Sequence, residues 1–578
     1  MSRKSFGELL ADMARFNPNG IAITCGERKI RWKDLNAKVN RFANALTSLG
    51  VKKGDHISIM FHDCPEFIEA NYAAQKIGAV PIPMNFRFVA SEIEYQVNHS
   101  DSTLLIFEDL FLDEVLAAKK NMPGIQHYIC LARSTSKAFG MIDYENIITH
   151  HDATPPEPCT TDDDICTICY TGGTTGLPKG VMLTYNNFWN LAESLFGDLI
   201  GRLASDEKVN FGRIISRLMN APRMEPAVNK IMSYPKVRSY LSTSIPVLLP
   251  KLSGTTIGPL LGRITGGLSM FLNMPLFHMA NYQILIIGPM SGLPRYIIRK
   301  GIHFDPKEVL ETIEREKPMV VICVPTQWKM LLKSPEIDLF DTSSVLVAMT
   351  GAGMNPAETK KEILKRFHKS LVVDIFGQTE MTPDTAIRID ASQEGIKNKS
   401  VGKPLAGIEM RIVDETGQNV AEGDTGEILY RSATVMKGYY GEKEKTEGAI
   451  KDGWFYSGDL GYIDPDGELI VVDRKGECIS TGGEKVFPHE VEEIISGNEK
   501  VGSVCVIGIP DQTWGHSVRA VVVIKDGQKA TEDELIAWCR SRMTGFKRPK
   551  SVLFADSLPL SPVGKVLRSQ VKDLYGKP

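Results

Sequence analysis

Short apolar runs alternate along the chain with stretches of helical periodicity. The run MVVICVP at 319–325 is short, apolar and rich in β-branched residues, which predicts a buried strand. The segment before it opens with Asp305 and Pro306, a pair typical of a helix start, with the carboxylate as N-cap and the proline in the first turn. This strand–helix–strand order predicts an α/β fold in which helices cover the sheets.

A smaller unit follows the strand candidate ELIVVD at 468–473 and a glycine-rich stretch. One helix candidate and two strand candidates then come at short intervals, at 489–496, 501–509 and 517–525, and another helix is expected to start near Thr531. About a hundred residues is an ordinary domain size. We therefore predict a large N-terminal domain over 1–473, made of sheets covered by helices, and a small α+β C-terminal domain over 474–578.

The composition fits a globular protein of two or more domains. With 578 residues the chain is too long for one ordinary core, and 43% hydrophobic and 24% charged residues are typical of a folded α/β protein. The net charge of −3 argues against a dedicated nucleic-acid binder, which needs an excess of Lys and Arg. The N-terminus lacks the long apolar core of a secretory signal and the ten cysteines are scattered, so we expect a cytoplasmic protein with reduced thiols.

The segment 202–270 departs from this charge balance. It holds ten Lys or Arg against three Asp or Glu, a local charge of +7 in a chain whose net charge is −3. Two interpretations stay open: a solvated helical insertion, or a basic surface with apolar residues that contacts a membrane or an anionic partner. The charge-free run from Ile264 to Leu293 has the length of a membrane span, but its prolines, glycines and polar residues favour buried strands and a site loop.

The stretch YTGGTTGLPKG at 170–180 places glycines, threonines and a lysine directly after an apolar run. Glycines allow successive backbone N–H groups to point at one anion, and threonine hydroxyls add donors, so the stretch predicts a phosphate-binding loop. A Walker A motif would need Ser or Thr after its lysine, whereas Gly180 follows Lys179 here and Pro178 precedes it. A P-loop NTPase is therefore disfavoured.

The same stretch resembles the signature of the acyl-adenylate-forming superfamily, which includes acyl- and aryl-CoA synthetases, firefly-type luciferases and the adenylation domains of peptide synthetases. Further segments resemble other motifs of this superfamily, in the same order along nearly the whole chain: PLFH at 275–278, GAG at 351–353, DIFGQTE at 374–380, GWFYSGDLG at 453–461, DRKGECISTGGEKVFPHEVE at 473–492 and LPLSPVGKVLR at 558–568. The resemblance implies a stand-alone acyl-CoA synthetase that uses ATP, Mg²⁺ and coenzyme A.

The resemblance also implies a nucleotide-binding set that is spread over these motifs. Its members are Thr171, Gly173, Thr174, Thr175, Gly176, Lys179, Gly351, Ala352, Phe376, Gly377, Thr379, Asp459 and Arg474. Phe376 would stack on the adenine, where the family more often has tyrosine. Asp459 and Arg474 would bind the ribose hydroxyls, one as an acceptor and the other as a donor.

Three residues would take part in the chemistry by the same resemblance. Glu380 would ligate Mg²⁺, and Lys565 would bridge the α-phosphate and the substrate carboxylate. His278 would lie between the acyl pocket and the path of the thiol. Taken alone, each has a structural interpretation as well: His278 fits a satisfied core histidine on an apolar strand, and Lys565 fits a solvated surface lysine.

The second half-reaction implies a mobile C-terminal domain. In the superfamily this domain swings to withdraw its lysine and to present a glycine motif, here Gly482 and Gly483, beside the pantetheine path. The hinge falls at Lys475 or Gly476, because the usual Asp or Lys aligns with Gly476 and the lysine comes one place early. Gly172 and Asn281 are further departures from the family pattern, the first in the phosphate loop and the second after PLFH.

The partners implied are a carboxylic acid, ATP and coenzyme A, with no nucleic acid. NYQILIIG at 281–288 has no aspartate to bind a substrate ammonium group, so an amino acid is disfavoured. The apolar residues around PLFH favour a medium- or long-chain fatty, alicyclic or aromatic acid. A non-catalytic nucleotide-binding or membrane-surface protein of the same fold stays open as the alternative, and the sequence leaves the oligomeric state undetermined.

Overall fold

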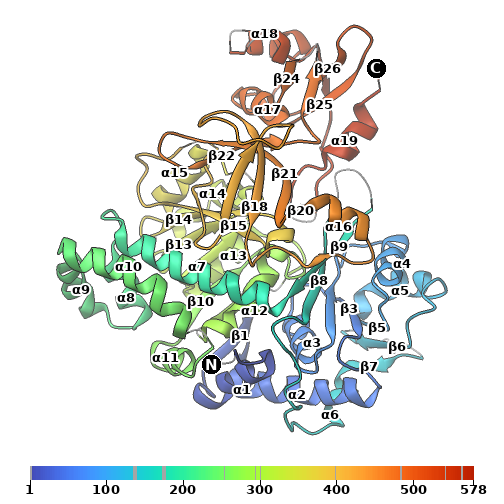
Figure 1. The fold of residues 1–578 in the computed structure, drawn as a ribbon, viewed down its shortest axis with the longest axis vertical. Helices are drawn as coiled ribbons and strands as arrows, with labels where there is room; N and C mark the ends of the chain where they lie inside the picture. Colours follow the sequence, from blue (N-terminus) through green and yellow to red (C-terminus); the bar gives the residue numbers. More distant parts are fainter. Residues whose placement is uncertain are drawn as a thin grey trace.

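The computed structural model describes residues 3–133, 140–171, 177–252, 254–292, 294–299, 301–353, 355–397, 399–481, 484–540, 542–543, 545–561 and 564–577. A large body of sheets and helices holds most of the chain, and a small unit formed by the last part of the chain lies at one end of it, coloured orange to red in Figure 1. This agrees with the predicted α/β fold of two unequal domains.

The main sheet of the large body is mostly parallel. Its order is β16-β15-β14-β13-β12-β10-β11-β1-β2. The parallel strands are β1 Ile21–Cys25, β10 Leu268–Leu272, β11 Pro294–Ile298, β12 Val320–Cys323, β13 Val347–Thr350 and β14 Leu371–Gly377. Antiparallel strands lie at both edges: β2 Arg28–Arg31, β15 Asp384–Asp390 and β16 Lys403–Pro404. The predicted strand at 319–325 is β12, which is buried along its length.

Helices cover this sheet because their apolar faces match its two surfaces. On one surface lie α13 Pro306–Glu316, α14 Pro325–Leu332 and α15 Ala357–Arg366, whose apolar side chains form one core with those of β10, β11 and β12. Asp305 caps α13 by accepting a hydrogen bond from the backbone N–H of Lys307 at 2.9 Å, and Pro306 lies in the first turn. The predicted helix start is therefore confirmed.

A second parallel sheet packs beside the first, in the order β4-β3-β5-β6-β7. Its strands are β3 His56–Met60, β4 Val80–Pro83, β5 Leu104–Glu108, β6 His127–Leu131 and β7 Ile142–Asp143. Helix α3 Pro65–Lys76 is buried along its whole length, since it lies between layers, while α2 Trp32–Ser48 buries one face. A short sheet of β8 Ile165–Thr171, β9 Lys179–Thr184 and β19 Gly438–Tyr439 joins this part to the next.

The run 264–293 differs from its prediction of buried strands. It contains one strand, β10, a loop at 273–278 and then helix α12 Met279–Ser291. The helix is apolar on all sides and nearly all its residues are buried, so its sequence carries no amphipathic period to separate a helix from a strand. Within the described residues, we find no helix that combines the length and the apolarity needed to cross a membrane.

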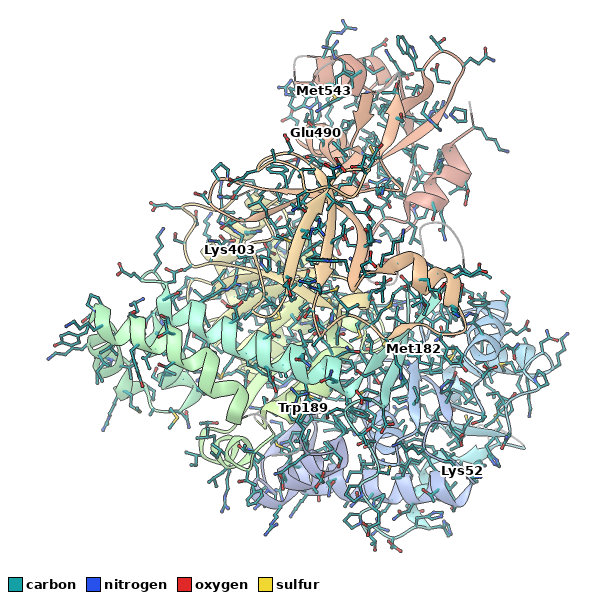
Figure 2. The ribbon with its side chains drawn as sticks, viewed as in Figure 1. Lys52, Met182, Trp189, Lys403, Glu490 and Met543 are labelled. Atoms are coloured by element: carbon teal, nitrogen blue, oxygen red, sulfur yellow. The ribbon has the colours of Figure 1, made fainter. Side chains whose placement is uncertain are left out.

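The segment 202–270 is helical, as one of its two interpretations predicts. It forms the end of α7 Tyr185–Ser205, then α8 Phe211–Leu218, α9 Glu225–Met232, α10 Pro235–Leu252 and α11 Ile257–Thr265. Helices α7 and α10 run side by side and extend from the body at the left of Figure 1. Gly254 turns the chain towards Trp189 of α7, labelled in Figure 2, where a Cβ on the glycine would lie 2.6 Å from the indole ring.

An antiparallel sheet leads from the large body towards the small unit. Its strands are β17 Glu409–Val413, β18 Gly426–Arg431, β20 Ile450–Lys451, β21 Trp454–Ile463 and β22 Leu469–Arg474. The small unit has its own core around β25 Val501–Asp511, β26 Gly515–Ile524 and β27 Ser551–Phe554, with α17 Pro488–Ser496, α18 Glu532–Arg540 and α19 Arg568–Tyr575. Glu490 and Met543 mark this unit in Figure 2. The predicted strands and helices of the C-terminal domain are confirmed.

Candidate active site

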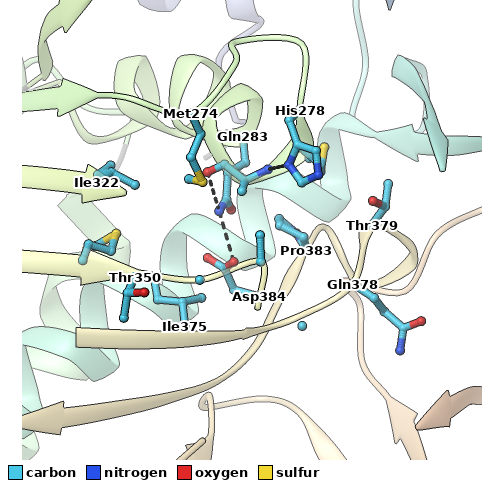
Figure 3. Close-up of a pocket in the computed structure, with 16 residues that line it drawn as sticks. Met274, His278, Gln283, Ile322, Thr350, Ile375, Gln378, Thr379, Pro383 and Asp384 are labelled. Atoms are coloured by element: carbon cyan, nitrogen blue, oxygen red, sulfur yellow. Dashed lines mark hydrogen bonds between the residues drawn. The ribbon is translucent and has the colours of Figure 1, made fainter. Parts of the chain in front are cut away.

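A cavity of about 100 Å³ opens at the carboxyl ends of β12, β13 and β14 (Figure 3). Its walls come from the loop before α12, the first turns of α12, the ends of these three strands and the start of β15. Five of the predicted site residues line it: His278, Gly351, Ala352, Gly377 and Thr379. Because neighbouring parallel strands end at the same edge of the sheet, motifs that are far apart in the sequence meet at this edge.

Two of these glycines are required by close backbone approaches. A Cβ at Gly377 would lie 1.8 Å from the carbonyl oxygen of Pro383, and one at Gly351 would lie 3.0 Å from that of Ile375. Ala352 has a positive φ of 59°, an uncommon conformation for a residue with a side chain. The backbone at the ends of β13 and β14 is therefore shaped tightly around the cavity.

Phe376 lies on β14 directly before Gly377. Its carbonyl oxygen accepts a hydrogen bond from Thr385 Oγ1 at 2.9 Å, and its side chain packs against the main core. The described lining of the cavity does not include this ring. Its proposed contact with adenine stays a prediction.

Glu380 lies in the turn after β14, close to the phosphate-loop strands. Its Oε1 accepts a hydrogen bond from the hydroxyl of Tyr439 at 2.9 Å, and the Nζ of Lys179 lies 4.6 Å from the centre of the same tyrosine ring. Thr171 is the register partner of Lys179 on β8 and β9. Tyr439 thus connects the acidic residue with the lysine of the loop, and sequence reasoning missed it because it lies 59 residues from Glu380.

Four further members of the predicted phosphate set, Gly173, Thr174, Thr175 and Gly176, lie outside the described residues, as does Gly172. Thr171 and Lys179 flank this segment, and both are half-buried. The two ends of the loop are thereby placed next to Tyr439 and Glu380.

Asp459 and Arg474 form an ion pair, with Nε of the guanidinium 2.9 Å from Oδ1 of the carboxylate. They are register partners on β21 and β22. Burial raises the pKa of Asp459, although the charge of Arg474 opposes this shift. Gln378 of the cavity lining is 3.5 Å from the other carboxylate oxygen through its Nε2, which links the pair to the cavity.

Lys565 reaches this site on a tight turn of the small unit. Leu560 and Val566 form an antiparallel bridge, and the backbone N–H of Ser561 donates to the carbonyl of Lys565 at 2.6 Å. Gly564 has a φ of +76°, and a Cβ there would lie 2.8 Å from Thr326 Oγ1 at the start of α14. The backbone at Gly564 therefore packs closely against the large body.

The lysine in this turn interacts with both sides of the site. Burial lowers the pKa of Lys565, and the charge of Arg474 lowers it further, while Glu477 and Asp459 raise it. In turn, the ammonium of Lys565 adds to the effect of burial, which lowers the pKa of His278 to about 4. These mutual effects place Lys565 among the predicted residues of the large body.

His278 is the N-cap of α12, so the alternative interpretation that places it on an apolar strand is wrong. Its Nδ1 accepts a hydrogen bond from the backbone N–H of Ala280 at 3.3 Å, drawn in Figure 3. An imidazole whose pKa is about 4 is neutral near pH 7. The side chain is half-buried and lines the cavity, where a neutral ring can contact an acyl group without a charge.

The predicted hinge and thioester residues are placed only in part. Lys475 donates from its backbone N–H to Gly458 at 2.8 Å and from Nζ to Glu427 at 2.7 Å. A Cβ at Gly476 would meet open space. Gly482 and Gly483 lie outside the described residues.

Sequence reasoning missed a buried polar pair in the same cavity. Gln283 of α12 donates from Nε2 to Oδ1 of Asp384, the first residue of β15, at 3.0 Å (Figure 3). Burial raises the pKa of Asp384 to about 7, and the hydrogen bond from Gln283 opposes this shift. The signal that could have found this aspartate is its position in TPDTAI, directly after Pro383 and two residues before the apolar Ala386, four residues after Glu380.

A group of side chains that could ligate a metal lies apart from this cavity. Among the described residues, the side chains of His62, Cys64 and Glu108 come within 4.8 Å of one another. The carboxylate of Glu108 is already bound by His62 Nδ1 at 2.6 Å and by Arg133 Nε at 3.2 Å. This group is therefore a hydrogen-bonded ion network.

Comparisons with known proteins agree with this arrangement. The family described as AMP-binding enzyme matches residues 10–210 and 255–440, and the AMP-binding enzyme C-terminal domain matches 490–565. A feruloyl-CoA synthase from Amycolatopsis sp is 30% identical over 577 residues, with all of both chains covered. A long-chain-fatty-acid–CoA ligase from Bacillus subtilis (strain 168) is 28% identical, covering 99% of this chain and 94% of that one.

A solved structure of similar fold is that of an anthranilate CoA ligase in complex with anthranoyl-AMP. It has a TM-score of 0.80 at 22% identity, and the likeness covers 99% of this chain and 98% of that one. At this identity the likeness concerns the fold alone. The family match and the full-length relatives go further: this chain belongs to the AMP-binding enzyme family, as an AMP-forming acyl-CoA synthetase.

Proposed function

We propose that the protein activates a compact carboxylic acid in the cavity beside β13 and β14 and transfers its acyl group to coenzyme A. In the first step a carboxylate oxygen attacks the α-phosphorus of ATP, which gives acyl-AMP and pyrophosphate. In the second step the thiolate of CoA attacks the acyl carbon, which gives the thioester and releases AMP. The observation that carries this proposal is the turn that brings Lys565 to the large body, where its charge interacts with those of Arg474 and Asp459 and with His278.

Lys565 would stabilise the charge that gathers in the first step. The bridge between Leu560 and Val566 and the close approach of Gly564 to Thr326 hold this lysine at the junction of the two units. A cation that is already positioned at a developing anion stabilises it without further reorganisation. We assign it the bridge between the α-phosphate and the substrate carboxylate, and Thr379 the contact with the α-phosphate.

The nucleotide would be bound from several sides. Asp459 and Arg474 offer an acceptor and a donor for ribose hydroxyls, and Gly351 with Ala352 would line the base beside Phe376. Thr171 and Lys179 stand at the two ends of the loop that would hold the β- and γ-phosphates. The full set, with Gly173, Thr174, Thr175, Gly176 and Gly377, remains our proposal.

Mg²⁺ fits the chemistry of the residues around Glu380. Mg²⁺ is usually held by one or two carboxylates together with substrate phosphates, and Glu380 is a carboxylate next to the lysine and threonine of the phosphate loop. The ion would supply positive charge to the phosphates. Tyr439 would orient Glu380 by donating a hydrogen bond to one of its oxygens.

The second step needs CoA to reach the acyl carbon. We propose that the C-terminal domain, from about residue 474, turns about Lys475 or Gly476 to bring Gly482 and Gly483 to the site. A Cβ at Gly476 would meet no atom within 4 Å, while Lys475 donates a hydrogen bond from Nζ to Glu427. Motions of this kind rest on a few residues that absorb the change in φ and ψ.

The size of the cavity guides the choice of acid. About 100 Å³ is small against the several hundred Å³ of many ligand pockets, and Met274, Met279 and Ile322 are among the bulky apolar side chains that line it. An aromatic or alicyclic ring therefore fits more readily than a long alkyl chain, which would need these side chains to move. Of the two relatives, one is named for ferulate, an aromatic acid, and the other for long-chain fatty acids. The size of the cavity favours the first kind of acid.

Acid-dependent exchange of labelled pyrophosphate into ATP tests the proposal. The panel holds short, medium and long fatty acids, benzoate and cyclic carboxylates, and CoA is then added to detect thioester. Exchange that depends on one acid class, followed by thioester formation, supports the proposal. Tight ATP binding without exchange for any acid would favour the non-catalytic alternative.

We also propose that the helices between 202 and 270 contact an anionic membrane surface. The AMP-binding family match leaves out 211–254, which is the larger part of this segment. Large apolar side chains are exposed on the helices between 202 and 270, namely Met224, Ile231, Tyr234, Tyr240, Ile257, Leu260, Leu261 and Ile264. Exposed basic side chains lie among them, namely Arg223, Lys230, Lys236 and Arg263. Apolar and basic groups together suit a surface with anionic headgroups.

Sedimentation with vesicles tests this contact. The test variant changes Arg223, Lys230, Lys236 and Arg263 to Gln, and the matched control changes four exposed lysines elsewhere, Lys52, Lys443, Lys529 and Lys572, to Gln. We expect the test variant alone to lose binding to anionic vesicles, with neutral vesicles binding neither. Equal binding by both variants would refute the contact. The cytoplasmic location of the protein remains a prediction.

A further inference from the structure

Two buried polar side chains meet in the lining of the cavity. Gln283 comes from α12 and Asp384 from β15, 101 residues apart, and each exposes only 3% of its surface. The neighbouring lining is formed by Met274, Ile322, Met349, Ile375 and Pro383. Such an environment makes any unused polar atom of this pair costly to leave unbound.

The hydrogen bonds of the pair leave two acceptors unused. Gln283 donates its amide hydrogens to Asp384 Oδ1 at 3.0 Å and to the carbonyl of Ala280 at 3.5 Å. Oε1 of Gln283 and Oδ2 of Asp384 have no hydrogen-bond partner among the described residues. Oε1 of Gln283 is a lone-pair acceptor, and Oδ2 of Asp384 is one when the carboxyl is ionised, so a substrate that enters this cavity can satisfy both atoms with a hydrogen-bond donor.

We propose that Gln283 and Asp384 select acids that carry a hydrogen-bond donor, a hydroxyl or an amino group, on a compact ring. The inference rests on the proposed function, since it names the chemical class of acid for the same cavity. A donor on the substrate completes the bonding of both side chains. An acid of the same shape with a methyl group in that place leaves both acceptors unbound in an apolar surrounding.

The electrostatics of Gln283 and Asp384 support a preference for a hydrogen-bond donor on the substrate. Burial raises the pKa of Asp384 to about 7, and the hydrogen bond from Gln283 is the influence that opposes this shift within the described part of the chain. A donor from the substrate would stabilise the carboxylate in the same way as Gln283 does. The pair can thus bind a neutral donor group without a charged partner in the substrate.

Matched substrates test the inference on the wild-type protein. ATP–pyrophosphate exchange is measured with the 2-, 3- and 4-substituted benzoates that bear hydroxyl, amino or methyl groups, and with the corresponding cinnamates. At one ring position we expect kcat/KM to be about tenfold or more higher for the hydroxyl or amino acid than for its methyl analogue. Comparison of kcat/KM between the hydroxyl acids and the amino acids of the panel shows which donor group is preferred.

The outcomes separate this inference from the proposed function. Exchange that is equal within twofold for donor and methyl acids at every position overturns the inference and leaves the synthetase function standing. No exchange with any acid in this panel or among fatty acids overturns the proposed function itself. A tenfold preference for methyl acids would also overturn the inference.

Variants locate the preference in the pair. Asp384→Val removes one acceptor, and we expect the donor acid to lose about tenfold or more in kcat/KM while the methyl acid keeps its value or gains. Gln283→Leu tests the other acceptor and serves as the second variant should Asp384→Val fold poorly, as judged by melting temperature and AMP binding. Donor preference that is unchanged in both folded variants would overturn the assignment.

Discussion

Asp459 and Arg474 face each other across the β21–β22 pair, with Nε of the arginine 2.9 Å from Oδ1 of the aspartate. Asp459 exposes only 5% of its side chain, while Arg474 exposes 40%. The same sheet carries a second ion pair, Arg431 with Glu409, in which both partners are exposed. The pair of Asp459 with Arg474 therefore lies at the site, on β21 and β22. The pair of Arg431 with Glu409 lies in solvent, on β18 and β17 of the same sheet.

Arg474→Ala is expected to weaken AMP binding by roughly tenfold to a hundredfold, because hydrogen bonds to charged groups contribute about 1.5–3 kcal/mol each. It also leaves the buried carboxylate of Asp459 unpaired. The free energy of unfolding should fall by about 2 kcal/mol, between the values of exposed and fully buried pairs. Calorimetric titration with AMP and denaturant unfolding measure the two effects.

Arg431→Ala is the matched control for this change. Since both partners of its pair are exposed, the variant should bind AMP like the wild type and lose at most about 1 kcal/mol of stability. Unchanged AMP affinity in Arg474→Ala would remove the ribose assignment.

Lys565→Ala should separate the two half-reactions. Loss of a cation aimed at a developing anion lowers the rate of adenylation by roughly a hundredfold to a thousandfold. Thioester formation from supplied acyl-AMP should keep most of its rate, because the lysine acts in the first step. The measurements are ATP–pyrophosphate exchange and the conversion of synthetic acyl-AMP by CoA.

The control for Lys565 is Lys572→Ala, which removes an exposed lysine from α19 of the same unit. It should leave both half-reactions unchanged. An intact rate of adenylation in Lys565→Ala would show that the turn at 560–566 serves another purpose, such as docking the small unit.

Tyr439→Phe is expected to raise the Mg²⁺ concentration needed for half-maximal exchange several-fold. The change removes only the hydroxyl that donates to Glu380 Oε1 at 2.9 Å, so the carboxylate loses its orienting partner. The ring that lies 4.6 Å from Lys179 is retained. Titration of exchange activity with Mg²⁺ measures the effect.

Tyr440 provides the control, because it is the next residue and its hydroxyl donates to Asp101 at 2.8 Å, outside the site. Tyr440→Phe should keep the Mg²⁺ dependence of the wild type. A similar shift in both variants would point to a general disturbance of the β19 segment and would remove the assigned role of Tyr439.

The sequence predicted those parts of the fold that local chemistry dictates. Asp305 and Pro306 begin α13 because their capping geometry needs no distant partner, and β12 follows from a short β-branched run. Helix α12 was not predicted, since a segment that is apolar on every side carries no period from which to read its structure. Its residues became helical through burial on all sides, which is a property of the whole fold.

The site could be predicted only where motifs mark it. His278, Gly351, Gly377 and Thr379 were named from resemblance, and the topology then brought them to one edge of the sheet. Tyr439 and the pair of Gln283 with Asp384 belong to no quoted motif. Their contacts span 59 and 101 residues, so only the folded chain shows which partner each one has.

The pH dependence of stability should report the buried carboxyl of Asp384. Its pKa is raised from 3.8 to about 7 by burial, so between these values the folded protein keeps a proton that the unfolded chain has lost. Stability therefore falls as pH rises from about 4 to about 7 and is level above that range. Because one proton held across one pH unit corresponds to about 1.4 kcal/mol, the loss amounts to at most about 4 kcal/mol.

Asp384→Asn removes this titration with little change in shape, so thermal unfolding of both proteins from pH 5 to pH 8 isolates it. We expect the melting temperature of the wild type to decline relative to that of the variant as pH rises. Asp556→Asn, a change at an exposed aspartate of the small unit, should run parallel to the wild type over the whole range. Parallel curves for Asp384→Asn as well would mean that the carboxyl of Asp384 is ionised throughout, because a group with the same charge in both states adds no slope.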